Sequence, residues 1–291
     1  MNGKSTAKQI VSQEAPPKSL TIETRVVLAV GICILVAAIC LVAFRHIFLH
    51  SSTWPQGWVN PFDAAIVRYV NRFANRWPWL CPALLYLDDH NILKGGPIVL
   101  LMWVAFFQKT RSAAKALERR RKIAAIVPLA IFGVCLARML AVALPFRERP
   151  IRTIALHFQL PAGLKPSFLY GWSSFPSDHA VLFVTLCIGL LMASRPLGSI
   201  ALAYTSIVIL LPRIFLGLHW PTDILAGMAI GITLASIVAI PRYRNFIWRL
   251  AMKCWEGWPG LFAAFVFLVS YEIIDLFGTL LTIAKWILHH H

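Results

Sequence analysis

The chain has 291 residues, of which 58% are hydrophobic and 14% charged, and its formal net charge is +16 at pH 7. This composition excludes an ordinary soluble domain and is typical of a polytopic membrane protein. The positive charge does not indicate a nucleic-acid partner, because the basic residues lie between apolar runs instead of along one continuous face. We expect them to set the membrane orientation and to bind anionic groups.

Apolar runs of the length of a membrane span recur along the chain. Residues 1–24 are polar and are expected to form a cytoplasmic tail, and residues 25–288 a single membrane domain. Six runs form the expected core and a seventh, interrupted by Glu272 and Asp275, follows them: residues 26–44, 92–107, 123–144, 177–192, 197–211, 222–240 and 260–283. The predicted fold class is therefore all-α, a polytopic membrane helix bundle.

One further helix is predicted outside the spans, over residues 62–79. Its apolar side chains recur at helical spacing and its polar side chains lie opposite them, so we expect an amphipathic helix in the membrane interface or packed against the bundle. The apolar positions are Phe62, Ile66, Tyr69, Val70 and Phe73, and the polar ones Asp63, Arg68, Asn71, Arg72 and Asn75.

Lysine and arginine orient the bundle through the positive-inside rule. The basic segments alternate, and those expected in the cytoplasm are residues 1–24, 109–122, Arg195 and 242–253. The connections 45–91, 145–176 and 212–221 then lie together on the extracytoplasmic face. The six cysteines have no metal-ligand spacing and fit small core residues, and the terminal histidines 289–291 resemble the remnant of a tag.

Ionisable residues are costly in a membrane and point to function, and the first group of them lies at the end of the third span. Arg138, Arg147 and Arg149 suit a phosphate, whose oxygens and charge match guanidinium groups. For Arg147 and Arg149 the alternative is a pair of interfacial charges that extend toward water.

The second group opens the fourth span. Ser177 is expected to cap a helix whose N-terminal N–H groups can bind an anion, and His179 one turn later is a candidate general acid. Asp178 between them is expected to act as a capping and dipole residue and to offer its backbone N–H.

The third group lies between the fifth and sixth spans. Arg213 is a permanent cation, and His219 is a candidate nucleophile. Asp223 lies four residues after His219, where it can orient the imidazole and support its charged form. The predicted orientation places all three groups at one membrane level, so one phosphoryl site is a simpler explanation than three unrelated polar segments.

These residues resemble the motifs of the type 2 phosphatidic acid phosphatase family, whose superfamily includes bacterial acid phosphatases and vanadium haloperoxidases. Its motifs are Lys-x6-Arg-Pro, Pro-Ser-x-His and Ser-Arg-x5-His-x3-Asp. The chain has Arg149-Pro150, Pro176-Ser177-Asp178-His179 and Arg213-x5-His219-x3-Asp223, so the match spans residues 138–223. It departs from the family at Val142 in place of the lysine, at Asp178 in place of glycine and at Pro212 in place of serine.

The resemblance implies an integral-membrane lipid phosphatase. His219 would form a phospho-histidine oriented by Asp223, and His179 would protonate the leaving oxygen. Arg138, Arg147, Arg149 and Arg213, with Ser177 and the Asp178 N–H, would hold the phosphate. No cofactor or metal and no obligate protein partner is expected. A polyprenyl or undecaprenyl diphosphate is the preferred substrate, with phosphatidate-type and lipid A phosphates as others.

Two alternatives stay open, namely a phosphotransferase that passes the phosphoryl group to a lipid or alcohol, and a lipid-binding or transport protein without chemistry. Lys94, just outside the second span, is expected either to anchor the end of that span or to contact a second phosphate. Asp88, Asp89 and His90 resemble a metal cluster, but a helix cap is the preferred interpretation.

Overall fold

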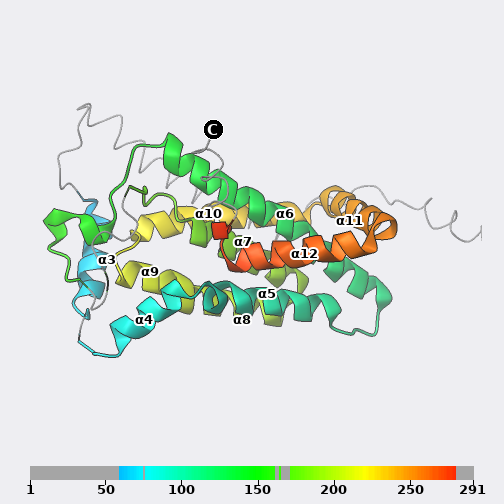
Figure 1. Cartoon of the computed structure of the whole chain (residues 1–291), viewed down its shortest axis with the longest axis horizontal. Coiled ribbons are helices and arrows are strands. Elements are labelled where there is room, and N and C mark those ends of the chain that lie inside the picture. The colour runs from blue at the N-terminus through cyan, green and yellow to red at the C-terminus, as the bar shows by residue number, and fades with distance from the viewer. Residues whose placement is uncertain (1–58, 75, 161–163, 165–170, 280–291) are drawn as a thin grey trace, which may run out of the picture.

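A computed structural model describes residues 59–74, 76–160, 164 and 171–279 of the chain. Every regular element within these residues is a helix, as the sequence predicted, whereas the apolar run 26–44, the tail and the terminal histidines lie outside them. The elements are α3 (Pro61–Asn71), α4 (Leu80–Asp89), α5 (Asn91–Phe107), α6 (Ala113–Ala143), η1 (Pro150–Arg152), η2 (Ile154–Leu156), α7 (Asp178–Ala193), α8 (Arg195–Tyr204), η3 (Thr205–Leu210), α9 (Leu211–Phe215), α10 (Pro221–Ser236), η4 (Ile237–Ala239), α11 (Pro241–Gly257) and α12 (Pro259–Ile274) (Figure 1).

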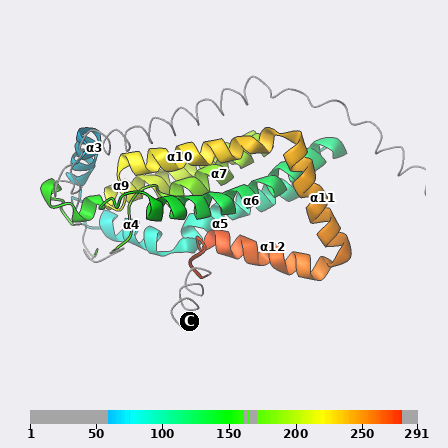
Figure 2. The ribbon, with the colours of Figure 1, turned by 90° about the horizontal axis from the view of Figure 1, so that it is seen from above.

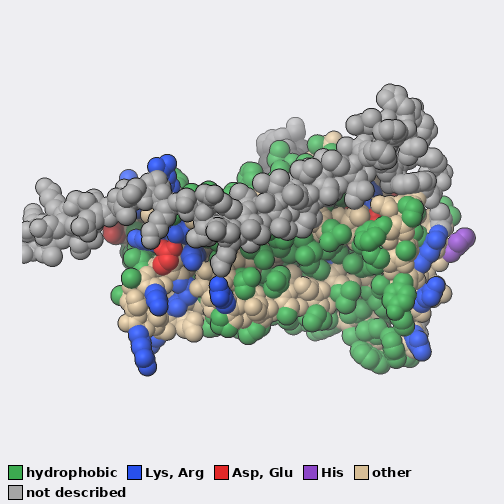
Figure 3. Space-filling view, turned by 180° about the vertical axis from the view of Figure 1, so that it is seen from behind, with side chains coloured by type: hydrophobic (Ala, Val, Ile, Leu, Met, Phe, Trp, Pro, Cys, Tyr) green, Lys and Arg blue, Asp and Glu red, His purple; other side chains and the backbone are tan. Residues whose placement is uncertain are grey.

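The bundle has the lengths and the surface of a membrane protein. Among the described residues, three stretches are long and apolar enough to cross a bilayer, namely Ala113–Ala143, Arg195–Phe215 and Pro221–Ala239. Helices α4 and α5 qualify as a pair that is bent by 64°, and α7 and α12 are shorter apolar helices. On the face seen in Figure 3, apolar side chains form a middle band with lysine and arginine at both ends. These features are those of an integral membrane helix bundle.

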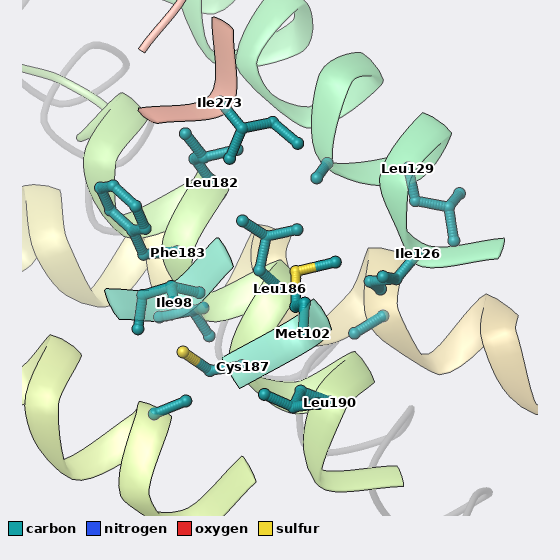
Figure 4. Packing of buried hydrophobic residues seen from close by; sticks show 14 of the residues in the cluster. Ile98, Met102, Ile126, Leu129, Leu182, Phe183, Leu186, Cys187, Leu190 and Ile273 are labelled. Carbon is teal, nitrogen blue, oxygen red and sulfur yellow. The ribbon is translucent and has the colours of Figure 1, made fainter. Parts of the chain in front are cut away.

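Helix α7 forms the centre of the bundle because it is apolar on all sides. Leu182 and Phe183 are fully buried and belong to one hydrophobic cluster with Ile98 of α5 and Ile126 of α6 (Figure 4). A helix that is hydrophobic all round is typical of such a central position. Its N-terminus is thereby fixed at the end of the bundle where α3 and α9 lie (Figure 1).

Helix α10 approaches α7 closely through Gly227 and Gly231. A Cβ atom at Gly227 would lie 2.6 Å from the carbonyl oxygen of Ser177, and one at Gly231 would lie 3.0 Å from the amide nitrogen of Thr185. Small residues at this spacing allow membrane helices to meet backbone to backbone. The first turns of the two helices therefore adjoin, and the amide of Ser177 donates to the carbonyl oxygen of Asp223 over 3.2 Å.

Helix α3 lies across the end of the bundle (Figure 2), and the face that it buries only partly matches the expected one. Phe62 and Tyr69 of the apolar face are 51% and 61% exposed, whereas Asp63 and Asn71 of the polar face are buried. The prediction of a helix is confirmed, although it ends at residue 71, and the assignment of its faces was partly wrong. The physical reason is that the surface beneath it is mixed: Asp63 accepts hydrogen bonds from the amide and the hydroxyl of Thr222, whereas Val67 belongs to an apolar cluster with Trp220.

Helices α11 and α12 form an arm at the other end of the bundle. The basic segment after α10 is the helix α11, which turns away from the bundle, and α12 runs back toward its middle (Figure 2). The seventh apolar run does not form one helix over 260–283, because α12 ends at Ile274 and the positive φ angles of Leu276 and Phe277 turn the chain. This turn brings the carbonyl oxygen of Leu276 within 2.7 Å of Nη2 of Arg138.

Candidate active site

Main-chain hydrogen bonds join the three connections at the α3 end of the bundle. The amide of Ile151 donates to Gly217 O over 3.0 Å, and the amide of Ser174 donates to Arg147 O over 2.9 Å. Together with the contact between the first turns of α7 and α10, these bonds bring all three predicted groups of polar residues into one unit.

The turn between α9 and α10 gives His219 a fixed place. Gly217 has a φ of +70°, a conformation that favours glycine, and a Cβ atom there would lie 2.6 Å from the ring of Phe158. On the other side, the amide of Trp220 donates to Oδ2 of Asp223 over 2.8 Å, which closes the first turn of α10. His219 lies between these two anchored points, and its side chain is buried.

The imidazole of His219 is held through Nδ1. This atom lies 2.8 Å from the carbonyl oxygen of Ser174 and 3.6 Å from Oδ2 of Asp223. A carbonyl only accepts, so Nδ1 carries the hydrogen and Nε2, which lies 3.4 Å from Nη1 of Arg149, carries the lone pair. Burial lowers the pKa of His219 below its ordinary value, and the nearby carboxylate of Asp223 acts in the opposite direction. A buried neutral imidazole with an unprotonated Nε2 has the form that a nucleophile needs.

His179 is held in the same way at the start of α7. Ser177 caps this helix, because its Oγ accepts from the amide of Ala180 over 3.4 Å. Oδ1 of Asp178 lies 2.8 Å from both the amide nitrogen and Nδ1 of His179. Nε2 lies 2.5 Å from Nη2 of Arg213, and because a guanidinium only donates, the hydrogen of the imidazole is on Nδ1. The carboxylate of Asp178 thus orients His179, a role that the sequence analysis did not assign to it.

Arg149 and Arg213 are buried with their guanidinium groups against the two histidines. Arg149 also donates to the carbonyl oxygen of Leu218 over 2.5 Å, and Arg213 forms a 3.0 Å ion pair with Asp88. Within the described ranges, Nε of each arginine has no hydrogen-bond partner, which leaves a donor for a ligand. Burial, followed by repulsion from Arg213, lowers the pKa of Arg149 to about 10, so this side chain stays charged at neutral pH.

Arg147 lies near Arg149 in the sequence, but its guanidinium group forms ion pairs with two carboxylates. Nη2 lies 2.5 Å from Oδ2 of Asp63, and Nη1 lies 2.5 Å from Oδ1 of Asp223 and 2.8 Å from the hydroxyl of Thr222. The group also lies over the ring of Trp220, 5.4 Å from its centroid. The expected role as a phosphate ligand therefore does not match this structure, where Arg147 connects α3 to the first turn of α10.

Arg138 is also engaged by other protein groups. Its Nη2 donates to Leu276 O over 2.7 Å, and its Nε lies 3.7 Å from Oδ2 of Asp178. Val142, where the family motif has lysine, is 85% exposed on the outside of α6. Neither position places a free cation beside the histidines, so the structure assigns Arg138 a contact with Asp178 rather than with a phosphate.

Two buried residues of the site, Asp88 and Asp63, escaped the sequence analysis, and a third, Lys94, was expected only as a span anchor or as a contact to a second phosphate. Asp88 was expected to cap a helix, but its carboxylate pairs with Arg213 instead. Nζ of Lys94 donates to the carbonyl oxygen of Asp88, and Asp63 is fully buried against Thr222. The signal for Lys94 was present, because a lysine beside an apolar run is costly to bury, whereas Asp63 looked like one of several polar residues on an exposed helix face. Among the described residues, no group of three or more His, Cys, Asp and Glu side chains is placed to hold a metal ion.

Comparison with known proteins confirms the family resemblance for the part of the chain that contains most of these residues. Residues 145–247 match the family model described as the PAP2 superfamily. A putative undecaprenyl-diphosphatase YbjG of Escherichia coli (strain K12) is 38% identical over 58 residues, which are 20% of this chain and only 29% of that protein. The bacitracin transport permease protein BcrC of Bacillus licheniformis is 22% identical over 171 residues, 59% of this chain and 76% of that protein.

A solved structure is also similar. It is the crystal structure of a transmembrane PAP2 type phosphatidylglycerolphosphate phosphatase from Bacillus subtilis, with 19% sequence identity and a TM-score of 0.45. The similarity covers 72% of this chain and 93% of that chain.

Proposed function

We propose that this protein is an integral-membrane lipid phosphatase that hydrolyses a lipid phosphate or diphosphate through a phospho-histidine. One observation carries the proposal: two buried histidines each have Nδ1 bound to an oxygen acceptor, and each turns Nε2 toward an arginine. The contacts are 3.4 Å between His219 and Arg149 and 2.5 Å between His179 and Arg213. A phosphoryl group placed between the two arginines would meet a nucleophile on one side and a proton donor on the other.

In the first step, Nε2 of His219 attacks phosphorus and the bond from phosphorus to the leaving oxygen breaks. The leaving oxygen takes a proton from Nε2 of His179, so His179 ends neutral and His219 carries the phosphoryl group. Arg149 and Arg213 neutralise the charge on the equatorial oxygens. Positioning and electrostatic stabilisation of this kind account for most catalysis of phosphoryl transfer.

In this structure His179 is not yet in the state that donates a proton. Arg213 donates to Nε2 of His179, which therefore has no hydrogen of its own at that atom. When Arg213 binds a phosphate, it no longer donates to Nε2 of His179, and this atom can take up a proton. The carboxylate of Asp178, 2.8 Å from Nδ1, then stabilises the doubly protonated ring. Binding of the anion and protonation of the general acid are thus coupled.

In the second step, water attacks the phospho-histidine. Neutral His179 takes a proton from this water, the bond between phosphorus and Nε2 breaks, and inorganic phosphate leaves. His219 is regenerated as a neutral imidazole with its hydrogen on Nδ1. The carbonyl oxygen of Ser174 at 2.8 Å and the carboxylate of Asp223 at 3.6 Å keep the ring in place through both steps.

Arg147, Asp63 and Arg138 act as positioning residues in this mechanism. Arg147 and Asp63 hold the Asp223 carboxylate against the turn that carries His219. Arg138 lies 3.7 Å from Asp178, which orients His179. Arginine cations supply the positive charge that a divalent ion provides in many other phosphatases, so we expect phosphate release without added metal and in the presence of EDTA.

The substrate class follows from where the site lies. The histidines are at one end of an apolar bundle, where a phosphate headgroup can reach them while its hydrocarbon chain stays in the bilayer. The preferred substrate is a polyprenyl diphosphate, and the similarity to the Escherichia coli relative, a putative undecaprenyl-diphosphatase, supports this choice. Phosphatidate-type and lipid A phosphates are the other members of the class.

The membrane orientation is part of the proposal. The basic connection 109–122 lies at the opposite end of the bundle from the histidines, where Arg244 pairs with Glu118 and Lys122 donates to Met192 O. The positive-inside rule places that end in the cytoplasm and the site on the extracytoplasmic face of a bacterial inner membrane. A membrane-impermeant thiol reagent on intact cells should label H157C and leave S112C unlabelled in cysteine-free protein; the reverse pattern would refute the orientation.

The activity is tested by phosphate release from purified protein in detergent, with polyprenyl diphosphates, phosphatidate and lipid A as substrates. We expect release from at least one of these lipids, and we expect H219A to abolish it. A matched control is H90A, because His90 lies at the α4–α5 bend and contacts Tyr86. Full release by H219A would refute the proposal. Release only when an alcohol or lipid acceptor is added would instead identify a phosphotransferase.

A further inference from the structure

We propose that Lys94 binds the second phosphate of a lipid diphosphate, on the side of the site where the leaving group departs. This inference rests on the proposed phosphatase function and names the residue that would make a diphosphate the better substrate. Lys94 contacts neither histidine, and the two-step mechanism described above makes no use of it.

Lys94 is a buried cation, 4% exposed, and it forms no ion pair in the part of the chain that the structure describes. The carboxylates of Asp88, Asp89 and Asp178 attract it from beyond ion-pair distance. Its ammonium group donates to the carbonyl oxygen of Asp88, while the carboxylate of that residue pairs with Arg213. A buried charge is normally paired, because the cost of removing it from water has to be offset.

Helix stability does not explain this lysine either. Lys94 lies in the first turn of α5, which begins at Asn91, and the helix dipole disfavours a cation at that end. An anion near the start of α5 would meet both the ammonium group and the positive end of the helix. A ligand phosphate therefore explains two features that the folded chain alone leaves unfavourable.

A chain of contacts places Lys94 on the leaving-group side. Lys94 is joined to Asp88, Asp88 to Arg213 at 3.0 Å, and Arg213 to His179 at 2.5 Å. His219, the proposed nucleophile, has a different cation, Arg149, at 3.4 Å. Because His179 protonates the leaving oxygen, the second phosphate, which is attached to that oxygen, lies on the side of Lys94.

The charge of the leaving group decides which substrate benefits. A lipid monophosphate leaves as a neutral alcohol, whereas a lipid diphosphate leaves as a lipid monophosphate that keeps its negative charge. When the bond between phosphorus and the bridging oxygen breaks, the bridging oxygen takes the proton from His179 and the remaining charge stays beside Lys94. Arg138 is bound to Leu276 O and Asp178 and is therefore not free for this role.

The test compares farnesyl diphosphate with farnesyl monophosphate as substrates of purified protein in detergent. We expect K94M to lower kcat/KM for the diphosphate by about 10- to 100-fold, the range for loss of a charge-assisted hydrogen bond, and to change that for the monophosphate by less than about threefold. K94R, which keeps the charge, should restore part of the preference. The matched control is K122M, because Lys122 also donates to a main-chain oxygen, that of Met192, at the opposite end of the bundle.

The possible results separate the inference from the function on which it rests. Equal losses for both substrates in K94M, or no loss for either, would overturn the role of Lys94 while leaving the phosphatase intact. Wild-type protein that releases phosphate from neither lipid, nor from phosphatidate or lipid A, would refute the proposed function itself. If K94M does not fold, inhibition of the wild-type protein tests the inference. Pyrophosphate should inhibit the wild type more strongly than phosphate does, and K94Q should remove this difference. Equal inhibition of the wild type by the two anions would overturn the inference.

Discussion

Nη2 of Arg213 lies 2.5 Å from Nε2 of His179, so the proposed proton donor has no hydrogen at the donating atom in this arrangement. We therefore predict that binding of a phosphate analogue is accompanied by uptake of a proton at His179. Calorimetry of vanadate binding in buffers of different ionisation enthalpy measures this uptake. Wild-type protein should take up about one proton more than H179N, and equal uptake by the two proteins would contradict the prediction.

The pH dependence of the reaction should report the burial of His219. Burial lowers the pKa of this imidazole, and a lowered pKa means that the nucleophilic neutral form persists at pH values below the ordinary value of about 6.5. The acid limb of kcat/KM should therefore lie below that pH. The charge of Arg149 also lowers this pKa, so R149Q should move the limb upward, and the carboxylate of Asp223 raises it, so D223N should move it downward. If the acid limb moved in the same direction in R149Q and in D223N, His219 would be excluded as the titrating group.

Stability should depend on Asp63, although this residue lies on α3 and outside the family motifs. Its carboxylate is fully buried and binds Arg147 and Thr222, so D63A leaves buried partners unsatisfied and should cost about 3–5 kcal/mol. The matched control is E118A, which breaks the partly exposed pair with Arg244 at the other end and should cost at most about 1 kcal/mol. Thermal unfolding in detergent compares the two, and equal shifts would show that Asp63 has no special structural role.

The contact between α7 and α10 should be sensitive to a single methyl group. G227A places a Cβ atom 2.6 Å from the carbonyl oxygen of Ser177, and since this is a backbone atom, the first turns that carry His179 and Asp223 must separate. We expect a loss of about 1–3 kcal/mol in stability and a clear loss of activity. G257A is the control, because a Cβ atom at Gly257 meets nothing within 4 Å. Full activity in G227A would mean that the two helix starts need not adjoin.

The sequence predicted most of the bundle and the identity of the central pair of histidines. Apolar runs and positive-inside charges carry that information locally, and the spacing of Arg213, His219 and Asp223 places all three near one turn. The faces of α3 were assigned partly wrongly because hydrophobic periodicity assumes an apolar neighbour. The neighbours of Asp63 are Thr222 and Arg147, and only the tertiary structure reveals that this polar side chain is buried.

The roles of individual charged residues could not be read from the sequence for a related reason. An arginine in a motif is equally suited to a phosphate and to a carboxylate, and the choice depends on which acidic residue the fold brings near it. Asp63 and Asp223 occupy Arg147, whereas Arg149 keeps a free Nε. Likewise, the carbonyl oxygen of Ser174 is a nearer partner of His219 than Asp223 is, and no side-chain pattern can indicate a main-chain acceptor.

Formation of a phospho-histidine at position 219 is the central claim, and trapping it is the most direct test. Purified protein would be mixed with a lipid diphosphate that carries a label on its terminal phosphate. The reaction would be quenched in alkali, which preserves a bond between phosphorus and nitrogen. The labelled peptide would then be mapped by mass spectrometry. We predict one phosphate on His219. The amount of phospho-histidine should increase in H179N when the substrate has an activated leaving group, which needs no acid in the first step, because the second step then lacks its base. Label on a different residue, or undiminished turnover by H219A, would contradict it.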